Sequence, residues 1–96
     1  MFLILITYTQ PLEAVDAFLV EHREYLKRNY AAGVFLLSGR KEPVDGGVIL
    51  ARASSAADLQ AIIATDPFKV HGVAAYQIVE FNPTMAAPGL ESLVVA

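Results

Sequence analysis

The stretch FLILITY, residues 2–8, decides the fold because it is apolar in both of its alternating sets. In an extended strand, successive side chains point to opposite faces. Phe2, Ile4 and Ile6 therefore fall on one face, whereas Leu3 and Leu5 fall on the other. A strand of this kind is covered on both sides. We expect it to lie inside a sheet, between two layers.

A long amphipathic helix is predicted directly after this strand. Apolar side chains and His22 recur at spacings of three and four over residues 11–31, and charged side chains lie between them. Pro11 is tolerated in the first turn of a helix, and Gly33 is typical of a helix end. We expect the apolar stripe to face the sheet.

The rest of the pattern completes a β-α-β-β-α-β order. Ser54 or Ser55 can cap a second helix, which Pro67 is expected to end because the residue before a proline is pushed out of the helical region. The DGG triplet at residues 45–47 is typical of a hairpin turn. The further expected strands are short and apolar, at residues 34–38, 48–52 and 74–81.

This order predicts an α+β fold of the ferredoxin-like type, a four-stranded antiparallel sheet with two helices on one face. Hydrophobic residues make up 55% of the chain. Since a small domain buries only part of its surface, the second face of the sheet needs a cover. We expect a second copy of the chain to supply it, in a homodimer packed through the sheet faces as a dimeric α+β barrel.

Residues 1–83 form the predicted domain, and residues 84–96 form a C-terminal extension punctuated by Pro88 and Gly89. The apolar end of this extension could pack on its own subunit, cross to the partner of a dimer, or join a larger oligomer.

The composition excludes several classes of protein. Seven Lys and Arg against ten Asp and Glu give a net charge of −3, without the basic stripe of a nucleic-acid-binding protein. The chain has no cysteine, which excludes disulfides and a thiol nucleophile. The apolar run at residues 2–6 is too short to span a membrane and has no basic segment before it. We therefore expect no membrane partner and a cytoplasmic location.

No metal and no cofactor are expected. The only histidines, His22 and His71, share no metal-binding motif, and His71 is expected in an exposed loop beside Gly72. A haem or metal enzyme is disfavoured by this shortage of ligands.

His22 and Asp66 are the candidate catalytic residues. His22 lies in the centre of the apolar stripe of the first predicted helix, where an imidazole needs a hydrogen-bond partner. It is either a satisfied core histidine or a general acid or base that faces a pocket. Asp66 is either a turn former before Pro67 or a carboxylate that orients His22 and fixes its tautomer. The spacing of the two residues does not show that they meet.

The segment after the second predicted strand is a candidate substrate-binding site. The Ser38 hydroxyl could bond a substrate, Gly39 allows a close approach of the backbone, and Arg40 could hold a carboxylate. The alternative is a strand end with solvated basic side chains. Tyr8 could line the same pocket or belong to the core.

With these residues in place, the chain resembles the YCII-related family over about residues 1–83. The motifs that carry the resemblance are short, but their order and spacing are specific. They are HRxxL at 22–26, GxFLxSG at 33–39, GGVIL at 46–50, DPF at 66–68 and YxIxxF at 76–81.

The resemblance implies a ferredoxin-like subunit of a dimeric α+β barrel, related to muconolactone isomerases. The family's proposed catalytic histidine and aspartate fall on His22 and Asp66, and its serine-glycine pair falls on Ser38 and Gly39. Many relatives have proline where this chain has Arg40. The mouth of the pocket is therefore expected to differ and to prefer an anionic group.

The leading hypothesis is a cofactor-independent enzyme in which His22, oriented by Asp66, performs acid–base chemistry on a small organic acid or lactone by isomerisation or elimination. The alternative is a non-catalytic module of the same fold that binds a small ligand or mediates assembly. In that case, His22 and Asp66 form a structural hydrogen bond.

Overall fold

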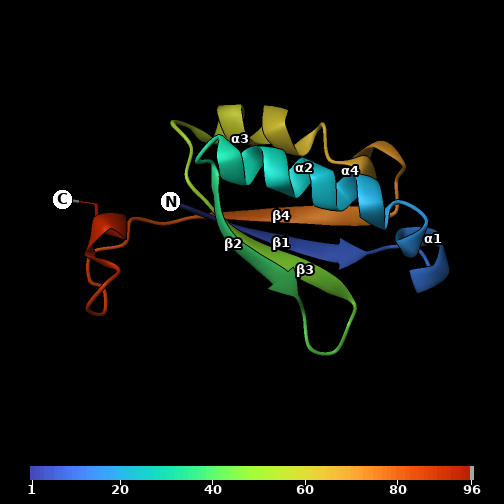
Figure 1. Ribbon diagram of the computed structural model, residues 1–96, viewed down its shortest axis with the longest axis horizontal. Helices are drawn as coiled ribbons and strands as arrows, with labels where there is room; N and C mark the ends of the chain where they lie inside the picture. The colour runs from blue at the N-terminus through green and yellow to red at the C-terminus, as the bar shows by residue number, and fades with distance from the viewer. Residues whose placement is uncertain (96) are drawn as a thin grey trace.

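The structure, a computed structural model, describes residues 1–95. One four-stranded antiparallel sheet has the strand order β2-β3-β1-β4, and the long helices lie together on one of its faces (Figure 1). The predicted ferredoxin-like α+β fold is confirmed. The elements are β1 Phe2–Tyr8, α1 Leu12–Asp16, α2 Leu19–Ala31, β2 Phe35–Arg40, β3 Gly46–Ala51, α3 Ala56–Ile63, α4 Pro67–Val70, β4 Ala74–Glu80 and the 3₁₀ turn η1 Glu91–Leu93.

The single helix expected over residues 11–31 is wrong, because the chain forms α1 and α2 with a break at Ala17 and Phe18. Phe18 leaves the helical region with φ −111° and ψ 10°. Its ring packs beside a small core of Val15, Phe68 and Val73. The break lets α2 run along the sheet, while α1 closes one end (Figure 1).

At the C-terminal end of α2, Gly33 ends the helix, as the sequence predicts. This glycine has φ +76°, a conformation that L side chains rarely adopt. The N–H of Gly33 donates to the Tyr30 carbonyl, and the N–H of Val34 donates to the Asn29 carbonyl, both at 3.0 Å. These two bonds satisfy the last carbonyls of the helix in a Schellman motif.

Contrary to the expectation, Pro67 does not end the second helix. The helix α3, capped by Ser55, stops at Ile63, and Pro67 is the first residue of the short helix α4. A proline is well suited to that position because the first helical N–H has no intrahelical partner. The side chain of Asp66 caps α4 by accepting from the Phe68 N–H.

The DGG triplet is also not a turn throughout. Gly46 and Gly47 begin β3, where they pair with Thr7 and Ile6 of β1. A Cβ atom on Gly46 would overlap the carbonyl oxygen of Ile6. The glycine is therefore required by the close approach of two strands rather than by a turn conformation.

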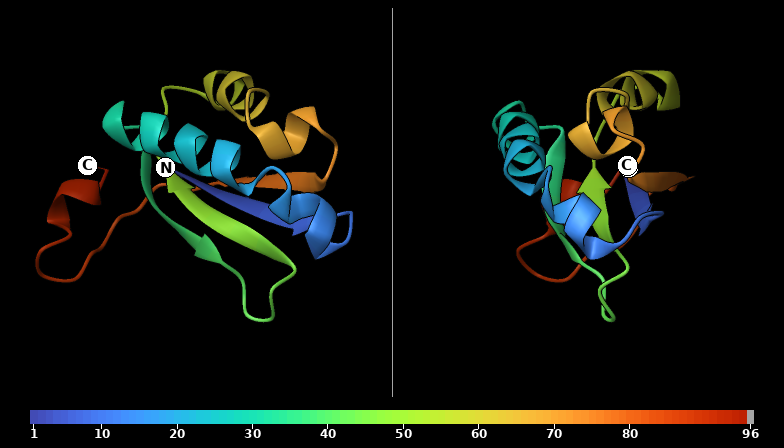
Figure 2. Two further views of the ribbon diagram at one scale, coloured as in Figure 1. Left: turned by 45° about the vertical axis from the view of Figure 1, so that its right-hand side comes forward. Right: turned by 90° about the vertical axis from the view of Figure 1, so that its right-hand side faces the viewer.

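The sheet has one covered and one open face. Phe2, Ile4 and Ile6 of β1 are at most 2% exposed beneath the helices. On the other face, the register places an apolar row across all four strands (Leu37, Leu50, Leu3 and Val79). Leu37 is 58% exposed and Val79 is 39% exposed. No helix among the described residues covers this row (Figure 2).

The C-terminal segment after β4 extends away from the sheet (Figures 1 and 2). Its backbone closes on itself, with the Val95 N–H donating to the Pro83 carbonyl at 2.8 Å. Met85 is 89% exposed. Residue 96, the last of the predicted extension, lies outside the described residues. Within residues 1–95, no helix is long and apolar enough to cross a membrane.

Candidate functional site

His22 and Asp66 meet in the folded chain, although 44 positions separate them. The Nδ1 atom of His22 lies 2.8 Å from Oδ1 of Asp66. His22 projects from the first turns of α2 and is 8% exposed, whereas Asp66 precedes α4 and is fully buried. The helix α4 packs against α2, which brings the two side chains together.

The Asp66 carboxylate has two further donors. Its Oδ1 accepts from the Phe68 N–H at 3.0 Å, and its Oδ2 accepts from the Tyr76 hydroxyl at 2.5 Å. Both of its oxygens thus serve as acceptors, which is the role of an ionised carboxyl group. The Nδ1 atom of His22 is then the third donor. This leaves the Nε2 atom with the lone pair that a general base needs.

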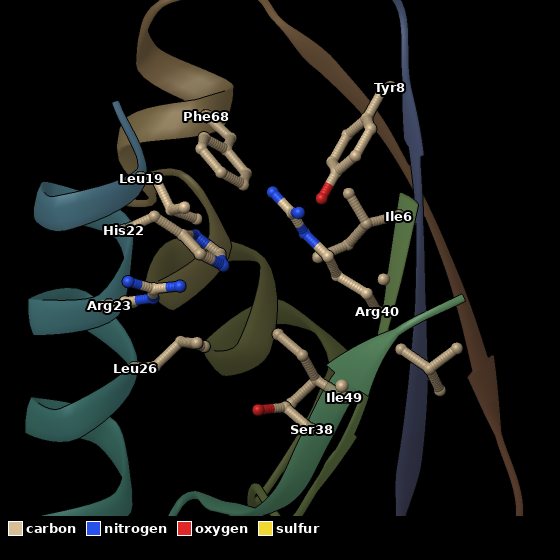
Figure 3. A pocket seen from close by; sticks show the side chains of 13 residues that line it. Ile6, Tyr8, Leu19, His22, Arg23, Leu26, Ser38, Arg40, Ile49 and Phe68 are labelled. Atoms are coloured by element: carbon tan, nitrogen blue, oxygen red, sulfur yellow. The ribbon is translucent and has the colours of Figure 1, made fainter. Parts of the chain in front are cut away.

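The ring of Phe68 fixes the plane of this imidazole. The His22 and Phe68 rings are stacked, with centroids 4.0 Å apart and planes 7° from parallel. The hydrogen bond holds one edge of the ring and the stacking holds one of its faces, so the ring has a single orientation. Its other edge, which carries Nε2, is turned towards a cavity beneath α2 (Figure 3).

The cavity has a volume of about 180 Å³ and lies between α2 and strands β1, β2 and β3. His22, Tyr8, Ser38, Gly39 and Arg40 all line it, while Asp66 is not among the lining residues and contacts His22. The sheet register explains this convergence. Ser38 is opposite Ile49 and Arg40 is opposite Gly47, so both side chains share the helix-covered face with Ile6. Gly39 contributes its backbone.

Two of these predicted substrate-binding side chains already have partners. The Ser38 and Tyr30 hydroxyls form a short hydrogen bond. Arg40 donates from one terminal nitrogen to Oδ1 of Asp16 at 3.0 Å. That hydrogen bond raises the pKa of Arg40; desolvation opposes the rise, and the nearby Tyr8 adds to it. Arg40 reaches across the cavity towards Tyr8 (Figure 3).

The sequence analysis did not identify several residues of the site. Arg23, one of the charged residues between the apolar positions of the predicted helix, lines the cavity. Phe68 and Tyr76 contact the His22–Asp66 pair. Arg23 could have been suspected from its place beside His22, but no sequence signal indicates that Tyr76 binds Asp66. His71 is exposed, as expected, and stacks on Phe18 at 3.9 Å.

No group of three or more metal-ligating side chains occurs in the part of the chain that the structure describes. His22 uses Nδ1 for Asp66, and no second imidazole or carboxylate lines the cavity.

The family profile of the YCII-related domain matches residues 1–82. The chain belongs to this family. Its fold is similar to that of 5-chloro-2-hydroxyhydroquinone dehydrochlorinase from Burkholderia phenoliruptrix AC1100, solved in complex with 2,5-dihydroxybenzoquinone. The TM-score is 0.72 at 17% identity, over 86% of this chain and 95% of that chain. No curated protein sequence matches the chain. This similarity shows a shared fold.

Because of two buried tyrosines near Asp66, we expect the protein to lose stability at alkaline pH. Burial and then the Asp66 charge raise the pKa of both Tyr25 and Tyr76 above the usual value. The unfolded chain loses these protons near pH 10, while the folded chain keeps them, so stability falls as pH rises above about 10. Urea midpoints measured from pH 8 to 11 should show this fall.

Tyr76→Phe is the matched variant for that measurement. Removing one of the two shifted phenols is expected to reduce the alkaline slope, even though the variant is less stable at neutral pH. A slope identical to that of the wild type would contradict the assignment to Tyr76.

Proposed function

We propose that the protein is a cytoplasmic, cofactor-independent enzyme that uses His22 as a general acid–base on a small organic acid. The observation that carries this proposal is the position of Nε2. It faces the cavity (Figure 3), while Asp66 holds Nδ1 at 2.8 Å. A carboxylate in that position stabilises the imidazolium that forms when His22 accepts a proton.

The proposed reaction begins with removal of a proton from carbon next to a carbonyl group. Nε2 of His22 takes the proton, and the C–H electron pair becomes a carbon–carbon double bond of an enolate. In an isomerisation, the imidazolium returns the proton to another carbon. In an elimination, the enolate electrons expel a leaving group such as chloride. The dehydrochlorinase of similar fold makes elimination the first reaction to test.

The other lining groups have positioning roles in this proposal. Arg40 would hold the carboxylate of the substrate, and the Ser38 hydroxyl and Gly39 backbone would set the reacting carbon near Nε2. Tyr8, on the same wall as Arg40, would complete the polar end of the cavity. A ligand that fills the space between the apolar walls would displace water, which would strengthen these electrostatic contacts.

Hydrogen exchange in D₂O tests the proposal even when the product is unidentified. Small keto acids, unsaturated lactones and chlorinated hydroxyquinones are incubated with the protein, and the ¹H signals next to the carbonyl are followed by NMR. Protein-dependent loss of a signal supports proton abstraction. Binding of these compounds without exchange or product would instead favour the non-catalytic module.

The open face of the sheet supports self-association as part of the same proposal. A row of four apolar residues, each on a different strand, offers a flat surface that a second sheet can cover (Leu37, Leu50, Leu3 and Val79). The segment after residue 83 carries the exposed side chain of Met85 and would pack on the resulting dimer.

Leu37→Glu is expected to convert the proposed dimer to a monomer, because it places a charge in the apolar row that the second sheet would cover. Light scattering coupled to size-exclusion chromatography measures the mass. Val20→Glu is the matched control, since Val20 is 70% exposed on α2, away from the sheet. A wild-type monomer, or a Leu37→Glu dimer of unchanged stability, would contradict the sheet-face interface.

A further inference from the structure

The cavity beside His22 is lined by positive charge, whereas the whole chain has a negative net charge. The whole chain has a net charge of −3, yet the charged side chains that line the cavity are Arg23 and Arg40, and no acidic side chain lines it. Tyr8 and Ser38 add hydroxyl groups that can donate. This set of groups is complementary to an anion.

The size of the cavity limits that anion to a small one. Its volume of about 180 Å³ is close to that of a cavity of about 150 Å³ that holds a benzene ring. The walls are apolar and aromatic side chains of the helices and the sheet (Ile6, Leu19, Leu26, Ile49 and Phe68). A flat ring or a short unsaturated chain with a carboxylate fits this lining.

Arg40 is already bonded to a carboxylate of its own chain, but in a weak arrangement. Asp16, the last residue of α1, accepts one hydrogen bond from one guanidinium nitrogen. The two side chains are 41% and 53% exposed, so solvent screens the pair. A guanidinium can instead hold a planar carboxylate through two parallel bonds. A ligand carboxylate inside the cavity would have the better geometry and less screening.

We propose that Asp16 competes with the anionic group of the ligand for the Arg40 guanidinium. It holds the Arg40 guanidinium over the cavity in the free protein, and a small planar carboxylate displaces it. The ligand carboxylate then lies on Arg40, with its ring or chain directed towards Nε2 of His22. This inference rests on the proposed function for the choice of cavity, but it concerns binding and needs no turnover.

Benzoate and benzamide are suitable probes because they differ in charge and hardly in shape. Titrations of the wild-type protein, followed by ¹H–¹⁵N NMR, give both dissociation constants. Benzoate is expected to bind at least about tenfold more tightly than benzamide, with shifts at residues of the cavity. Equal affinities, or no benzoate binding at millimolar concentration, would overturn the proposal.

Two pairs of charge-matched variants then test the roles of Asp16 and Arg40. Asp16→Asn should bind benzoate about three- to tenfold more tightly than Glu13→Gln, an exposed α1 variant with the same change in net charge. Arg40→Gln should bind it at least about tenfold more weakly than Arg52→Gln, whose exposed side chain lies outside this cavity.

The direction of the Asp16→Asn effect is decisive. A residue that merely orients Arg40 would weaken benzoate binding when removed, and a general charge effect would appear equally in Glu13→Gln. Either result would overturn the competitor role. Failure of the proposed acid–base function would appear elsewhere, as the absence of hydrogen exchange in D₂O while benzoate still binds.

Discussion

His22→Gln is expected to lower kcat by about 10²- to 10⁴-fold on any substrate that the exchange screen identifies. Glutamine is similar in length to histidine and can still donate a hydrogen bond to Asp66, so the packing is largely kept. It cannot accept and return a proton near neutral pH. The loss should therefore fall on kcat, with little change in KM. Steady-state kinetics of the purified variant measure both.

His71→Gln is the control for this substitution. It removes the only other histidine of the chain, at the exposed C-terminal end of α4, and should leave kcat unchanged. Benzoate binding to His22→Gln shows independently that the cavity is intact. A His22→Gln protein with wild-type kcat would contradict acid–base catalysis by His22 and favour a ligand-binding module.

The order of the elements and the general place of the site could be predicted from the sequence. A strand that is apolar on both faces needs layers on both sides, and the stripe of α2 puts His22 on the side that faces the sheet. The face taken by Ser38 and Arg40 could not be predicted from simple alternation. Phe35 is buried on the helix-covered face, and regular alternation from it would turn Ser38 to the open face. The register of β2 shifts between Phe35 and Leu37, and this shift brings Ser38 and Arg40 to the helix-covered face.

The break at Phe18 could not be predicted, because it depends on packing between distant residues. The apolar residues of 11–31 recur with a continuous helical spacing. Phe18 nevertheless leaves the helix and packs beside Phe68, which is 50 positions away in the sequence. At Phe18, a tertiary contact therefore overrides a local preference. Pro67 is different, because Asp66 at the N-cap and Pro67 at the first helical position form a local helix-start signal that the sequence contains.

The contact between His22 and Asp66 also lies beyond local sequence reasoning. It requires α4 to pack against α2 and β4 to place Tyr76 under the carboxylate. Family resemblance pointed to the two residues, but not to the Tyr76 hydroxyl and Phe68 N–H that complete the set of donors. These two groups explain why a carboxylate is tolerated at a position without solvent contact.

Asp66→Ala is expected to lower the free energy of unfolding by about 3–5 kcal/mol, a large fraction of the total for a small domain. The carboxylate is fully buried and accepts hydrogen bonds from three groups (the His22 ring, the Phe68 N–H and the Tyr76 hydroxyl). Alanine leaves all three donors buried without an acceptor. Urea unfolding gives the change from the midpoint, provided that the slope is unchanged.

Asp58→Ala is the control, because Asp58 is an exposed carboxylate in the first turn of α3. Its removal should lower the free energy of unfolding by no more than about 1 kcal/mol. A double-mutant cycle with His22→Ala isolates the pair. If the hydrogen bond between His22 and Asp66 is formed, Asp66→Ala costs less when His22 is already alanine. Additive costs would show that the two side chains do not interact in solution.

The stability of Asp66→Ala does not by itself separate the two functional hypotheses. A structural pair and a catalytic pair both predict a costly Asp66→Ala and a coupled cycle, since both need the same buried hydrogen bond. Asp66→Asn distinguishes them, because its carbonyl oxygen can still accept from the Phe68 N–H while the negative charge is lost. A catalytic pair needs that charge to stabilise the imidazolium, so kcat should fall far more than stability does. In a structural pair, the amide oxygen still accepts from His22 and the Phe68 N–H. The Tyr76 hydroxyl can turn to accept from the new NH2 group, so the loss of stability should be modest and no turnover depends on the charge.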